Sequence, residues 1–215
     1  MEENRHYTTI IWDFNGTLLN DMQVCIDCMN VLLEKRGLPL LDVGRYREIF
    51  TFPVREYYQR LGFDFTKDPF DIPAHQFIDL YREKLHTAPL HDDTIRILEH
   101  FRKKGVTQII LSAMEQNFLE ETIALKGITG YFDMIVGIKD HLAEGKAEIA
   151  REALKGHDLQ NGNYILIGDT IHDYEVAQEL GIPCVLVADG HQSVERLRKL
   201  DCEVVERLES LICKL

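Results

Sequence analysis

Short apolar runs, several of them rich in β-branched residues, recur along this chain. They occupy residues 8–12, 108–111, 134–136, 164–167, 184–187 and, more weakly, 203–205. The segments between them carry apolar residues three and four positions apart, which is the spacing of an amphipathic helix. This alternation predicts an α/β protein with a doubly wound parallel sheet, because parallel strands need crossover helices that cover both faces.

Four of the intervening segments are predicted to be helices that pack on the sheet. They span residues 94–104, 115–126, 146–155 and 173–180. In the first of them we expect Ile95, Leu98 and Phe101 to face inward. A glycine closes each segment, as is typical of helix C-termini, at Gly105, Gly127, Gly156 and Gly181.

The first and second predicted strands are separated by roughly 90 residues, far more than one crossover connection needs. Only helix-like patterns occur in this stretch, near residues 21–36, 41–50, 54–61 and 72–85. We interpret the stretch as a helical cap inserted into the α/β core. The predicted cap comprises residues 19–87, and the predicted core comprises residues 1–18 and 88–215.

The composition narrows the classes of partner. The chain has 215 residues, of which 45% are hydrophobic, and this suffices for a real core. A net charge of -12 argues against a general nucleic-acid binder, which needs a basic face to displace counterions from phosphates. No apolar run approaches the roughly 20 residues of a membrane span, and the first residues lack a signal-peptide pattern. We therefore expect a cytoplasmic protein, monomeric or dimeric, without membrane or nucleic-acid partners.

Polar residues follow the predicted strands at the points where ligands bind in open parallel sheets. Asp13 follows the first strand, and Ser112 follows the second. Lys146 comes after the third strand, at the start of a predicted helix, while Asp169 and Asp173 come after the fourth. The carboxyl ends of parallel strands lie at one edge of the sheet, so we expect these side chains to converge.

Taken together, these residues resemble the four motifs of the haloacid dehalogenase superfamily of phosphohydrolases. The motifs are D-x-N-G-T-L from residue 13, Ser112, Lys146, and G-D-T-x-x-D from residue 168. The resemblance covers essentially the whole chain and implies a Rossmann-like core. The place of the helical insertion is similar to that in the branch containing phosphoglycolate phosphatase and β-phosphoglucomutase. The resemblance implies that Asp13 attacks phosphorus in a small phosphorylated metabolite, forms an aspartyl-phosphate, and releases it to water.

Several carboxylates that converge in a cleft repel one another, and each is costly to keep ionised unless a cation is present. Mg²⁺ suits such a site because it binds through one or two carboxylates together with substrate phosphate and water. We expect Asp13 and Asp169 to be direct ligands, with the backbone carbonyl of Asn15 as a third. Asp173 is expected to act through water or as an orienting neighbour.

Phosphoryl transfer needs positive groups and hydrogen-bond donors directed at the phosphate oxygens. A hydroxyl from Ser112, the charge of Lys146 and backbone N–H groups of the first loop provide them. Gly16 allows a tight turn in that loop. The expected phosphate-binding residues are Phe14, Gly16, Thr17, Ser112, Ala113 and Lys146.

Each of these side chains also has an ordinary structural interpretation. Asp13 and Asp173 are typical of turns and helix N-termini, and Ser112 is a possible N-cap for the helix near residue 115. Lys139 competes with Lys146, since it lies closer to the end of the third strand. These alternatives stay open in the sequence alone.

Asn15 departs from the motif that the rest of the chain resembles, in which phosphatases and phosphomutases carry Asp at this position. An Asp there protonates the leaving oxygen and then activates water, and such acid–base catalysis contributes about 10²–10⁴-fold. An amide donates a hydrogen bond but delivers no proton at neutral pH. The catalytic set predicted from the motifs is therefore Asp13, Asn15, Ser112 and Lys146, with an altered role for Asn15.

Three consequences of Asn15 compete. The first is a phosphatase whose leaving group needs little protonation, such as an acyl phosphate, a phenolic ester or a pyrophosphate. The second is a slow enzyme with a persistent aspartyl-phosphate, and the third is an inactive protein that binds phosphorylated ligands. A phosphomutase of the β-phosphoglucomutase type is a further enzymatic alternative, although it normally draws on the Asp that is replaced here.

Three more residues are candidates near the site. Arg55 follows a turn at residues 51–54 in the predicted cap, where we expect it either to contact a second anionic group of the substrate or to be solvated. His172 and His191 lie near the same edge of the sheet, and their ordinary interpretation is that of solvent-facing loop residues. Sugar phosphates, phosphoglycolate and nucleotides all remain possible substrates.

Overall fold

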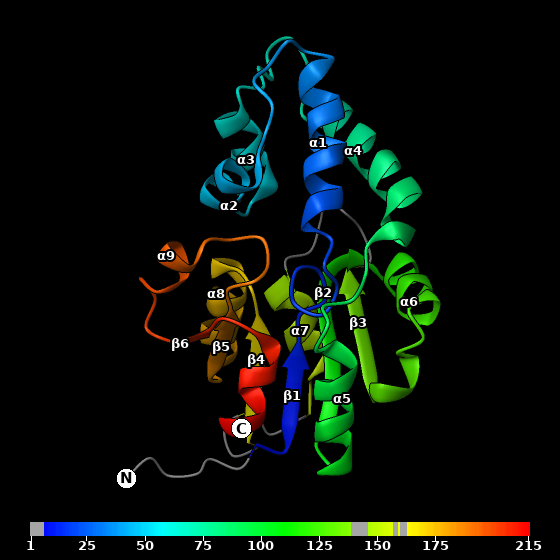
Figure 1. The fold of residues 1–215 in the computed structure, drawn as a ribbon, viewed down its shortest axis with the longest axis vertical. Helices are drawn as coiled ribbons and strands as arrows, with labels where there is room; N and C mark the ends of the chain where they lie inside the picture. The colour runs from blue at the N-terminus through cyan, green and yellow to red at the C-terminus, as the bar shows by residue number, and fades with distance from the viewer. Residues whose placement is uncertain (1–6, 139–145, 157–158, 160–162) are drawn as a thin grey trace.

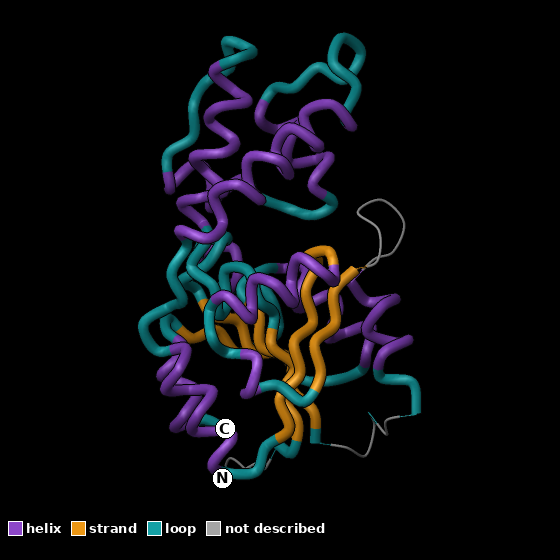
Figure 2. Tube along the Cα trace, turned by 90° about the vertical axis from the view of Figure 1, so that its right-hand side faces the viewer, coloured by secondary structure: helices purple, strands orange, loops and turns teal. Residues whose placement is uncertain are grey.

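The computed structural model describes residues 7–138, 146–156, 159 and 163–215. Its centre is a parallel sheet with the strand order β3-β2-β1-β4-β5-β6 (Figures 1 and 2). The strands are β1 (Thr9–Trp12), β2 (Thr107–Glu115), β3 (Met134–Ile138), β4 (Tyr164–Gly168), β5 (Cys184–Val187) and β6 (Glu203–Val205). The order runs outward in both directions from the β1–β4 pair, so the predicted doubly wound α/β fold is confirmed.

Helices cover both faces of the sheet because the central strands alternate apolar side chains between them. Ile10 and Trp12 of β1 pack with α5, α6 and the short helix η3, whereas Ile11 packs with α7 and α8 on the other face. None of the helices in the described ranges is long and apolar enough to cross a membrane. The elements are α5 (Thr94–Lys103), α6 (Gln116–Leu125), α7 (Lys146–Ala153), α8 (Ile171–Leu180), α9 (Val194–Leu197), η1 (Leu85–Thr87), η2 (Thr129–Tyr131) and η3 (Leu208–Cys213).

One expected core residue of α5 faces outward. Ile95 is 42% exposed, while Ile97, Leu98 and Phe101 are buried against the sheet. Thr94 is also buried, and its hydroxyl donates to the carbonyl oxygen of Leu18. The buried face of α5 therefore runs through residue 94 and the positions three, four and seven residues later, which turns residue 95 toward solvent.

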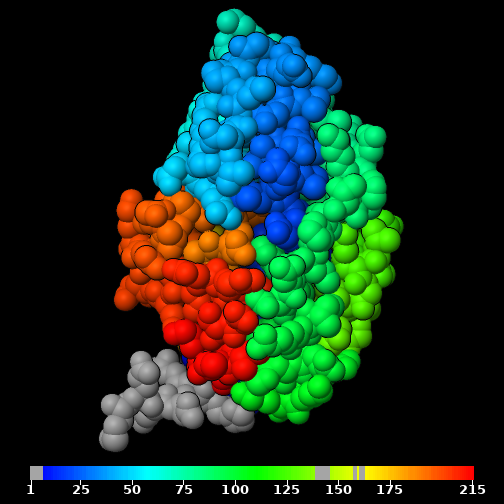
Figure 3. All heavy atoms as spheres, in the orientation of Figure 1, coloured from blue at the N-terminus to red at the C-terminus, as the bar shows by residue number. Residues whose placement is uncertain are grey.

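Four helices between β1 and β2 form a unit of their own beyond the carboxyl edge of the sheet (Figures 1 and 3). Their shared apolar core includes Leu32, Tyr46, Tyr58 and Leu61. The helices are α1 (Met22–Glu34), α2 (Val43–Ile49), α3 (Val54–Leu61) and α4 (Asp71–Lys84). The division at residues 19 and 87 remains a proposal, and we use the word cap for the unit α1–α4.

The cap contacts the core through residues 189–196, which comprise the loop after β5 and the first residues of α9 and which we name the seam loop. Arg47 of α2 donates from Nε to the carbonyl oxygen of Gly190 at 3.1 Å. In the opposite direction, Arg196 donates from Nη1 to the carbonyl oxygens of Arg47 and Phe50 at 2.8 and 2.7 Å. These bonds hold α2 over the carboxyl ends of β4 and β5.

The second strand is longer than its apolar run. β2 continues through Ser112 to Glu115, and its pairing with β3 shifts register between Leu111 and Glu115. The expectation that Ser112 follows the strand is therefore corrected: it lies inside β2, at the irregular part of its pairing with β3. The N-cap of α6 is Glu115, whose carboxylate accepts from the N–H groups of Asn117 and Phe118, so Ser112 does not cap this helix.

Candidate active site

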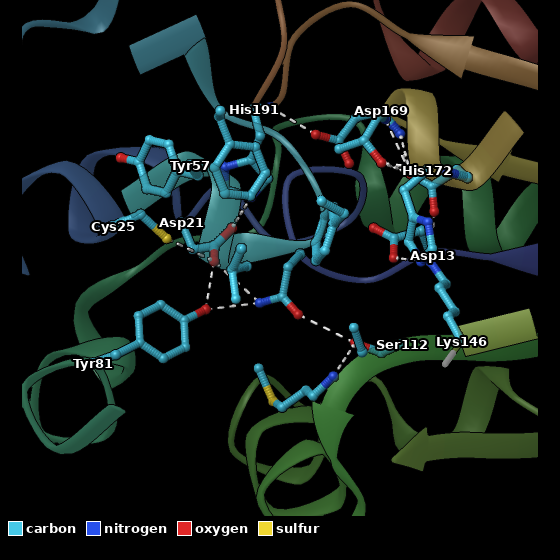
Figure 4. A pocket seen from close by; sticks show the side chains of 18 of the residues that line it. Asp13, Asp21, Cys25, Tyr57, Tyr81, Ser112, Lys146, Asp169, His172 and His191 are labelled. Carbon is cyan, nitrogen blue, oxygen red and sulfur yellow. Dashed lines mark hydrogen bonds and ion pairs between the residues drawn. The ribbon is translucent and has the colours of Figure 1, made fainter. Parts of the chain in front are cut away.

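Two carboxylates lie side by side because the strands that precede them are neighbours. β1 pairs with β4 in the register Trp12 to Ile167, and Asp13 and Asp169 follow the two strands. The N–H of Asp13 donates to the carbonyl oxygen of Ile167 at 2.8 Å, which extends the pairing of β1 with β4 by one residue. Asp169 is fully buried and Asp13 is 7% exposed. Figure 4 shows both side chains at one wall of a cavity.

A buried lysine joins this pair to a third carboxylate. Lys146 is 3% exposed and donates from Nζ to Oδ1 of Asp13 and, at 2.5 Å, to Oδ1 of Asp173. The other oxygen of Asp173 accepts from the N–H and hydroxyl of Thr170 at 3.0 and 2.6 Å. Asp173 thus completes the capping box of α8 with the N-cap Thr170 and pairs with Lys146, which confirms its structural interpretation, while its role at a metal site stays a prediction.

One lysine does not fully offset the free-energy cost of holding three buried carboxylates in their charged form. Burial raises the pKa of Asp13 above its usual range, although Lys146 acts to lower it. Burial also raises the pKa of Asp169. The pKa of Asp173 is lowered instead: burial opposes this, but Lys146 stabilises the charged form. Oxygens of Asp13, Asp169 and Asp173 lie within 4.8 Å of one another, and a hard divalent cation fits this donor set.

Replacing Lys146 by Met is expected to lower the free energy of unfolding by about 3–5 kcal/mol, because it leaves Asp13 and Asp173 buried without their cation. Denaturant titration in the presence of a chelator measures this. Lys103→Met is the matched control, since Lys103 is exposed and its ion pair with Glu99 lies on the surface, and we expect its effect to stay within about 0.5 kcal/mol. Equal effects of the two variants would contradict the structural role of Lys146.

The loop after β1 depends on a glycine. Gly16 has a φ of 81°, in the left-handed region, and a Cβ at this position would overlap Asp169 and His191. Its N–H already donates to Leu19 O at 2.8 Å and to Asp21 Oδ1 at 2.9 Å. We therefore correct the expectation that this N–H faces phosphate: Gly16 permits the close approach of the loop to Asp169 but offers no unused donor.

The hydroxyl of Thr17 contacts the carboxylates of Asp13 and Asp169 and does not face the cavity as an unused donor for phosphate. Its hydroxyl lies 3.2 Å from Oδ2 of Asp13 and 3.0 Å from Oδ1 of Asp169, and it donates its single proton to one of them at a time. Thr17 is completely buried. The hydroxyl therefore orients the two acidic side chains, which is a different part from the phosphate contact expected from the sequence.

The side chain of Asn15 is held by three neighbours. Its Nδ2 donates to Oδ2 of Asp21 at 3.1 Å and to the hydroxyl oxygen of Tyr81 at 2.7 Å. Its Oδ1 accepts from the hydroxyl of Ser112 at 3.3 Å. Both N–H groups of the amide are thus used within the protein, so Asn15 keeps no free donor for a ligand.

Sequence reasoning missed Asp21, which the helical pattern marked only as the start of α1. Asp21 is 1% exposed, accepts from Asn15 and Tyr81, and lies 3.2 Å from Nε2 of His191. Nδ1 of His191 lies 2.8 Å from the hydroxyl of Tyr46. A polar cluster thus connects the first loop, the cap and the seam loop. No local signal identifies it, since its members are brought together only by the packing of the cap on the core.

Charges within this cluster balance. Burial opposes ionisation of Asp21, but the adjacent His191 lowers the pKa of its carboxyl. Burial likewise acts to lower the pKa of His191, yet Asp21 raises it to about 9. His191 is 4% exposed, so its interpretation as a solvent-facing residue is wrong.

These residues line a cavity of about 230 Å³ between the carboxyl edge of the sheet and the cap. Of the residues expected at the site, Asp13, Asn15, Ser112, Ala113, Lys146, Asp169 and Asp173 line it. His172 also lines it, with its ring stacked at 4.8 Å on that of Phe52.

One candidate lies outside the cavity. The guanidinium of Arg55 lies over the rings of Phe65 and Phe70, 4.8 and 5.2 Å from their centroids, and Arg55 does not line the cavity. The expected contact between Arg55 and substrate is therefore corrected. Lys139, the alternative to Lys146, falls outside the described residues.

Comparison with known proteins agrees with this geometry. Residues 10–187 match the family model described as haloacid dehalogenase-like hydrolase. The chain belongs to this family. The matched stretch runs from β1 to the end of β5, so it contains all four motifs together with the cap. The resemblance to haloacid dehalogenase-like hydrolases expected from the sequence is confirmed, and with it the assignment of the chain to a family of enzymes.

Individual relatives of this haloacid dehalogenase-like chain are distant but cover most of its length. A 5'-nucleotidase from Pseudomonas aeruginosa is 24% identical over 89% of this chain and 87% of its own. A phosphoglycolate phosphatase from Caulobacter vibrioides is 25% identical over 85% of this chain and 80% of its own, as the expected branch predicts. The solved structure of a haloacid dehalogenase-like hydrolase from Streptococcus pneumoniae superimposes with a TM-score of 0.80 at 24% identity, covering 95% and 97% of the two chains. This last likeness confirms the fold.

Proposed function

We propose that the chain is a Mg²⁺-dependent phosphatase that acts on a small phosphorylated molecule through an aspartyl-phosphate on Asp13. The observation that carries this proposal is the position of Asp13, which lines a cavity beside the buried side chain of Lys146 and the buried carboxylates of Asp169 and Asp173. A phosphatase and a nucleotidase among the relatives agree with a phosphate ester as substrate. The seclusion of the cavity beneath the cap fits a small substrate better than a macromolecule.

The residues at the carboxyl edge fit a divalent cation. Asp13 and Asp169 would hold it through carboxylate oxygens and Asn15 through its backbone carbonyl, while Asp173 orients the group from its bond with Lys146. The raised pKa values of the buried Asp13 and Asp169 support this assignment, because they indicate acidic groups that lack sufficient positive charge nearby. When bound, the cation supplies charge that neutralises and orients the phosphate oxygens.

The remaining parts of the reaction fall to the protein's own groups. We assign phosphate binding to Lys146 and the backbone N–H groups of Phe14 and Ala113. The hydroxyl of Ser112 would join them by turning its proton from Asn15 Oδ1 to the phosphate. An oxygen of Asp13 attacks phosphorus, and the bond to the leaving oxygen breaks. Water then attacks the same phosphorus atom, releases inorganic phosphate and regenerates the Asp13 carboxylate. The cap would exclude bulk water during the first step and select the leaving group.

Asn15 decides how the leaving oxygen departs. Its amide has no proton to deliver, and its N–H groups are already bonded to Asp21 and Tyr81. This arrangement gives little support to a phosphomutase, which needs proton shuttling on alcohol oxygens. The same observation favours one other candidate, a slow or inactive protein that binds phosphorylated ligands. Retention of Asp13 beside a buried lysine favours the enzyme.

Phosphate release from a panel of phosphate esters in the presence of Mg²⁺ tests the proposal. We expect turnover that is lost when a chelator removes the metal and is restored when excess Mg²⁺ is added. Mg²⁺ should also increase the free energy of unfolding by about 2.7 kcal/mol at a concentration a hundred times its dissociation constant, and the melting temperature should rise accordingly. Release that persists in the chelator would contradict metal dependence. Stabilisation by Mg²⁺ without release from any ester would favour the binding protein.

A further inference from the structure

The leaving-group side of the cavity is built from aromatic rings. Its walls there include Phe50, Phe52, Tyr57, Phe77, Tyr81 and Phe118. Five of these six rings come from the cap or the turn within it, and Phe118 comes from the first turns of α6. A cavity of about 150 Å³ can accommodate benzene, so about 230 Å³ leaves room for one ring and a phosphate group.

Positive charge is scarce in the same cavity. Among the lining residues in the described ranges, Lys146 is the one with a permanent positive charge, and Asp13 and Asp173 already bind it. The two lining histidines also face carboxylates: His191 lies 3.2 Å from Asp21, and His172 lies 3.4 Å from a glutamate of its own helix. No cation of this part of the chain is therefore free to bind a second anionic group on the substrate.

Negative charge, by contrast, lines the leaving-group side. Glu115 lines the cavity, and Asp21 lies beneath Asn15. Arg82 pairs with Glu115 at 3.1 Å and covers the ring of Phe118, but Arg82 does not itself line the cavity. A leaving group with a carboxylate or a second phosphate would lose its hydration here without gaining a partner.

Three polar side chains of the lining have no free proton for the leaving oxygen. Asn15 has no donor to spare, and the hydroxyl of Tyr81 donates to Asp21. The two ring nitrogens of His191 face Asp21 and the hydroxyl of Tyr46. The oxygen must therefore depart as an anion, which depends on the acidity of its conjugate acid. The phenol of tyrosine has a pKa of about 10, which is well below the pKa of water or of a simple alcohol. A phenolate is the better leaving group by several orders of magnitude.

Two independent features carry the inference: the aromatic lining without a free cation, and the lack of a proton for the leaving oxygen. From them we infer that the substrate is an aryl phosphate with an uncharged ring, that is, the phosphate monoester of a phenol. This inference rests on the proposed phosphatase function. An oxygen of Asp13 bonds to phosphorus as the P–O bond to the ring breaks, and the electron pair leaves on the phenolate, which takes a proton from water. A water molecule then hydrolyses the aspartyl-phosphate, so that the ester and one water yield phenol and inorganic phosphate.

Matched substrates separate acidity, ring and charge. The pair 4-ethylphenyl phosphate and 2-phenylethyl phosphate has the same ring but a phenol against an alcohol as leaving group. The pair 4-ethylphenyl phosphate and 4-(carboxymethyl)phenyl phosphate has similar phenol acidity but differs by one negative charge. Acetyl phosphate offers an acidic leaving group without a ring. We expect kcat/KM for 4-ethylphenyl phosphate to exceed that for the alcohol ester by at least about 100-fold and that for the charged aryl ester by about tenfold. Acetate leaves more readily than a phenolate but has no ring, so we expect KM for acetyl phosphate to be about tenfold higher than KM for 4-ethylphenyl phosphate.

Phe118→Leu tests the aromatic wall, with Phe65→Leu as the matched control, because Phe65 lies in the cap and does not line the cavity. The readout is the ratio of kcat/KM for 4-ethylphenyl phosphate to that for acetyl phosphate, which is independent of the folded fraction. We expect Phe118→Leu to lower this ratio about fivefold and the control to leave it unchanged.

Two failures are distinguishable. Asp13-dependent hydrolysis in which kcat/KM for 2-phenylethyl phosphate or for the charged aryl ester equals or exceeds that for 4-ethylphenyl phosphate would overturn the inferred substrate class and leave the phosphatase standing. A KM for acetyl phosphate equal to or below that for 4-ethylphenyl phosphate would do the same. Absence of Asp13-dependent release from every ester would overturn the proposed function and this inference together.

Discussion

Replacing Asp13 by Asn is expected to reduce kcat for every phosphate ester by about 10³-fold or more, because the amide cannot form the aspartyl-phosphate. Steady-state phosphate release measures this, together with a quenched-flow search for phosphorylated protein. Asp27→Asn is the matched control, since Asp27 is exposed on α1 and bonds only to Gln23, and its kcat should be unchanged.

The same substitution separates catalysis from folding. Burial raises the pKa of Asp13 above its usual range, so the charged carboxylate is costly to the folded protein when no metal is bound. We therefore expect Asp13→Asn to melt at the same or a higher temperature than the wild type in the presence of a chelator. Lower stability together with lower activity would indicate that Asp13 supports the fold, and retained activity would exclude it as the nucleophile.

Exchanging the side chains of Asn15 and Asp21 is expected to raise kcat on alkyl phosphates by about 10²-fold, since it places an acid within reach of the leaving oxygen. Asn15 Nδ2 and Asp21 Oδ2 are 3.1 Å apart, so Asn15→Asp alone would put two carboxylates in contact and remove the donors that Asp21 uses. We expect this single variant to lose about 1–3 kcal/mol of stability. The double variant, Asn15→Asp with Asp21→Asn, restores one donor and one acceptor.

Activity on a simple alkyl phosphate and on an aryl phosphate, measured for both single variants and the double variant, tests this exchange. The gain should be confined to the alkyl ester, because a phenolate needs no proton to leave. Asp21→Asn alone is the control and should show no gain on the alkyl ester. A double variant that gains nothing on alkyl phosphates would show that Asn15 does not occupy the position of the missing acid.

Much of the site was predictable from the sequence because it follows from strand ends. A buried run that ends in a carboxylate, as at Asp13 and Asp169, has few structural alternatives in a parallel sheet. The same reasoning placed Ser112 after the second strand, although it lies within β2. The apolar run ends at Leu111, while the backbone pairing continues to Glu115. Apolar patterning reports burial and does not report where main-chain pairing stops.

What the sequence could not provide depends on contacts between distant segments. Asp21 and His191 are 170 positions apart, and they meet only because α2 packs against the seam loop. The N–H of Gly16 likewise donates to Asp21 only because the turn between them brings the Asp21 carboxylate close to it. Arg55 has aromatic partners within the cap, and a charged residue at a helix start gives no sign of that.

The seam loop faces the cap with one side and the acidic cluster with the other. The N–H of His191 donates to Oδ2 of Asp169 at 2.7 Å, and a Cβ at Gly190 would overlap that carboxylate. Arg47 and Arg196 tie the same loop to α2. Movement of the cap away from the core would remove these ties and loosen the support of Asp169. With Asp169 as the proposed metal ligand, the affinity for metal and the closure of the cap would be thermodynamically linked, and each should strengthen the other.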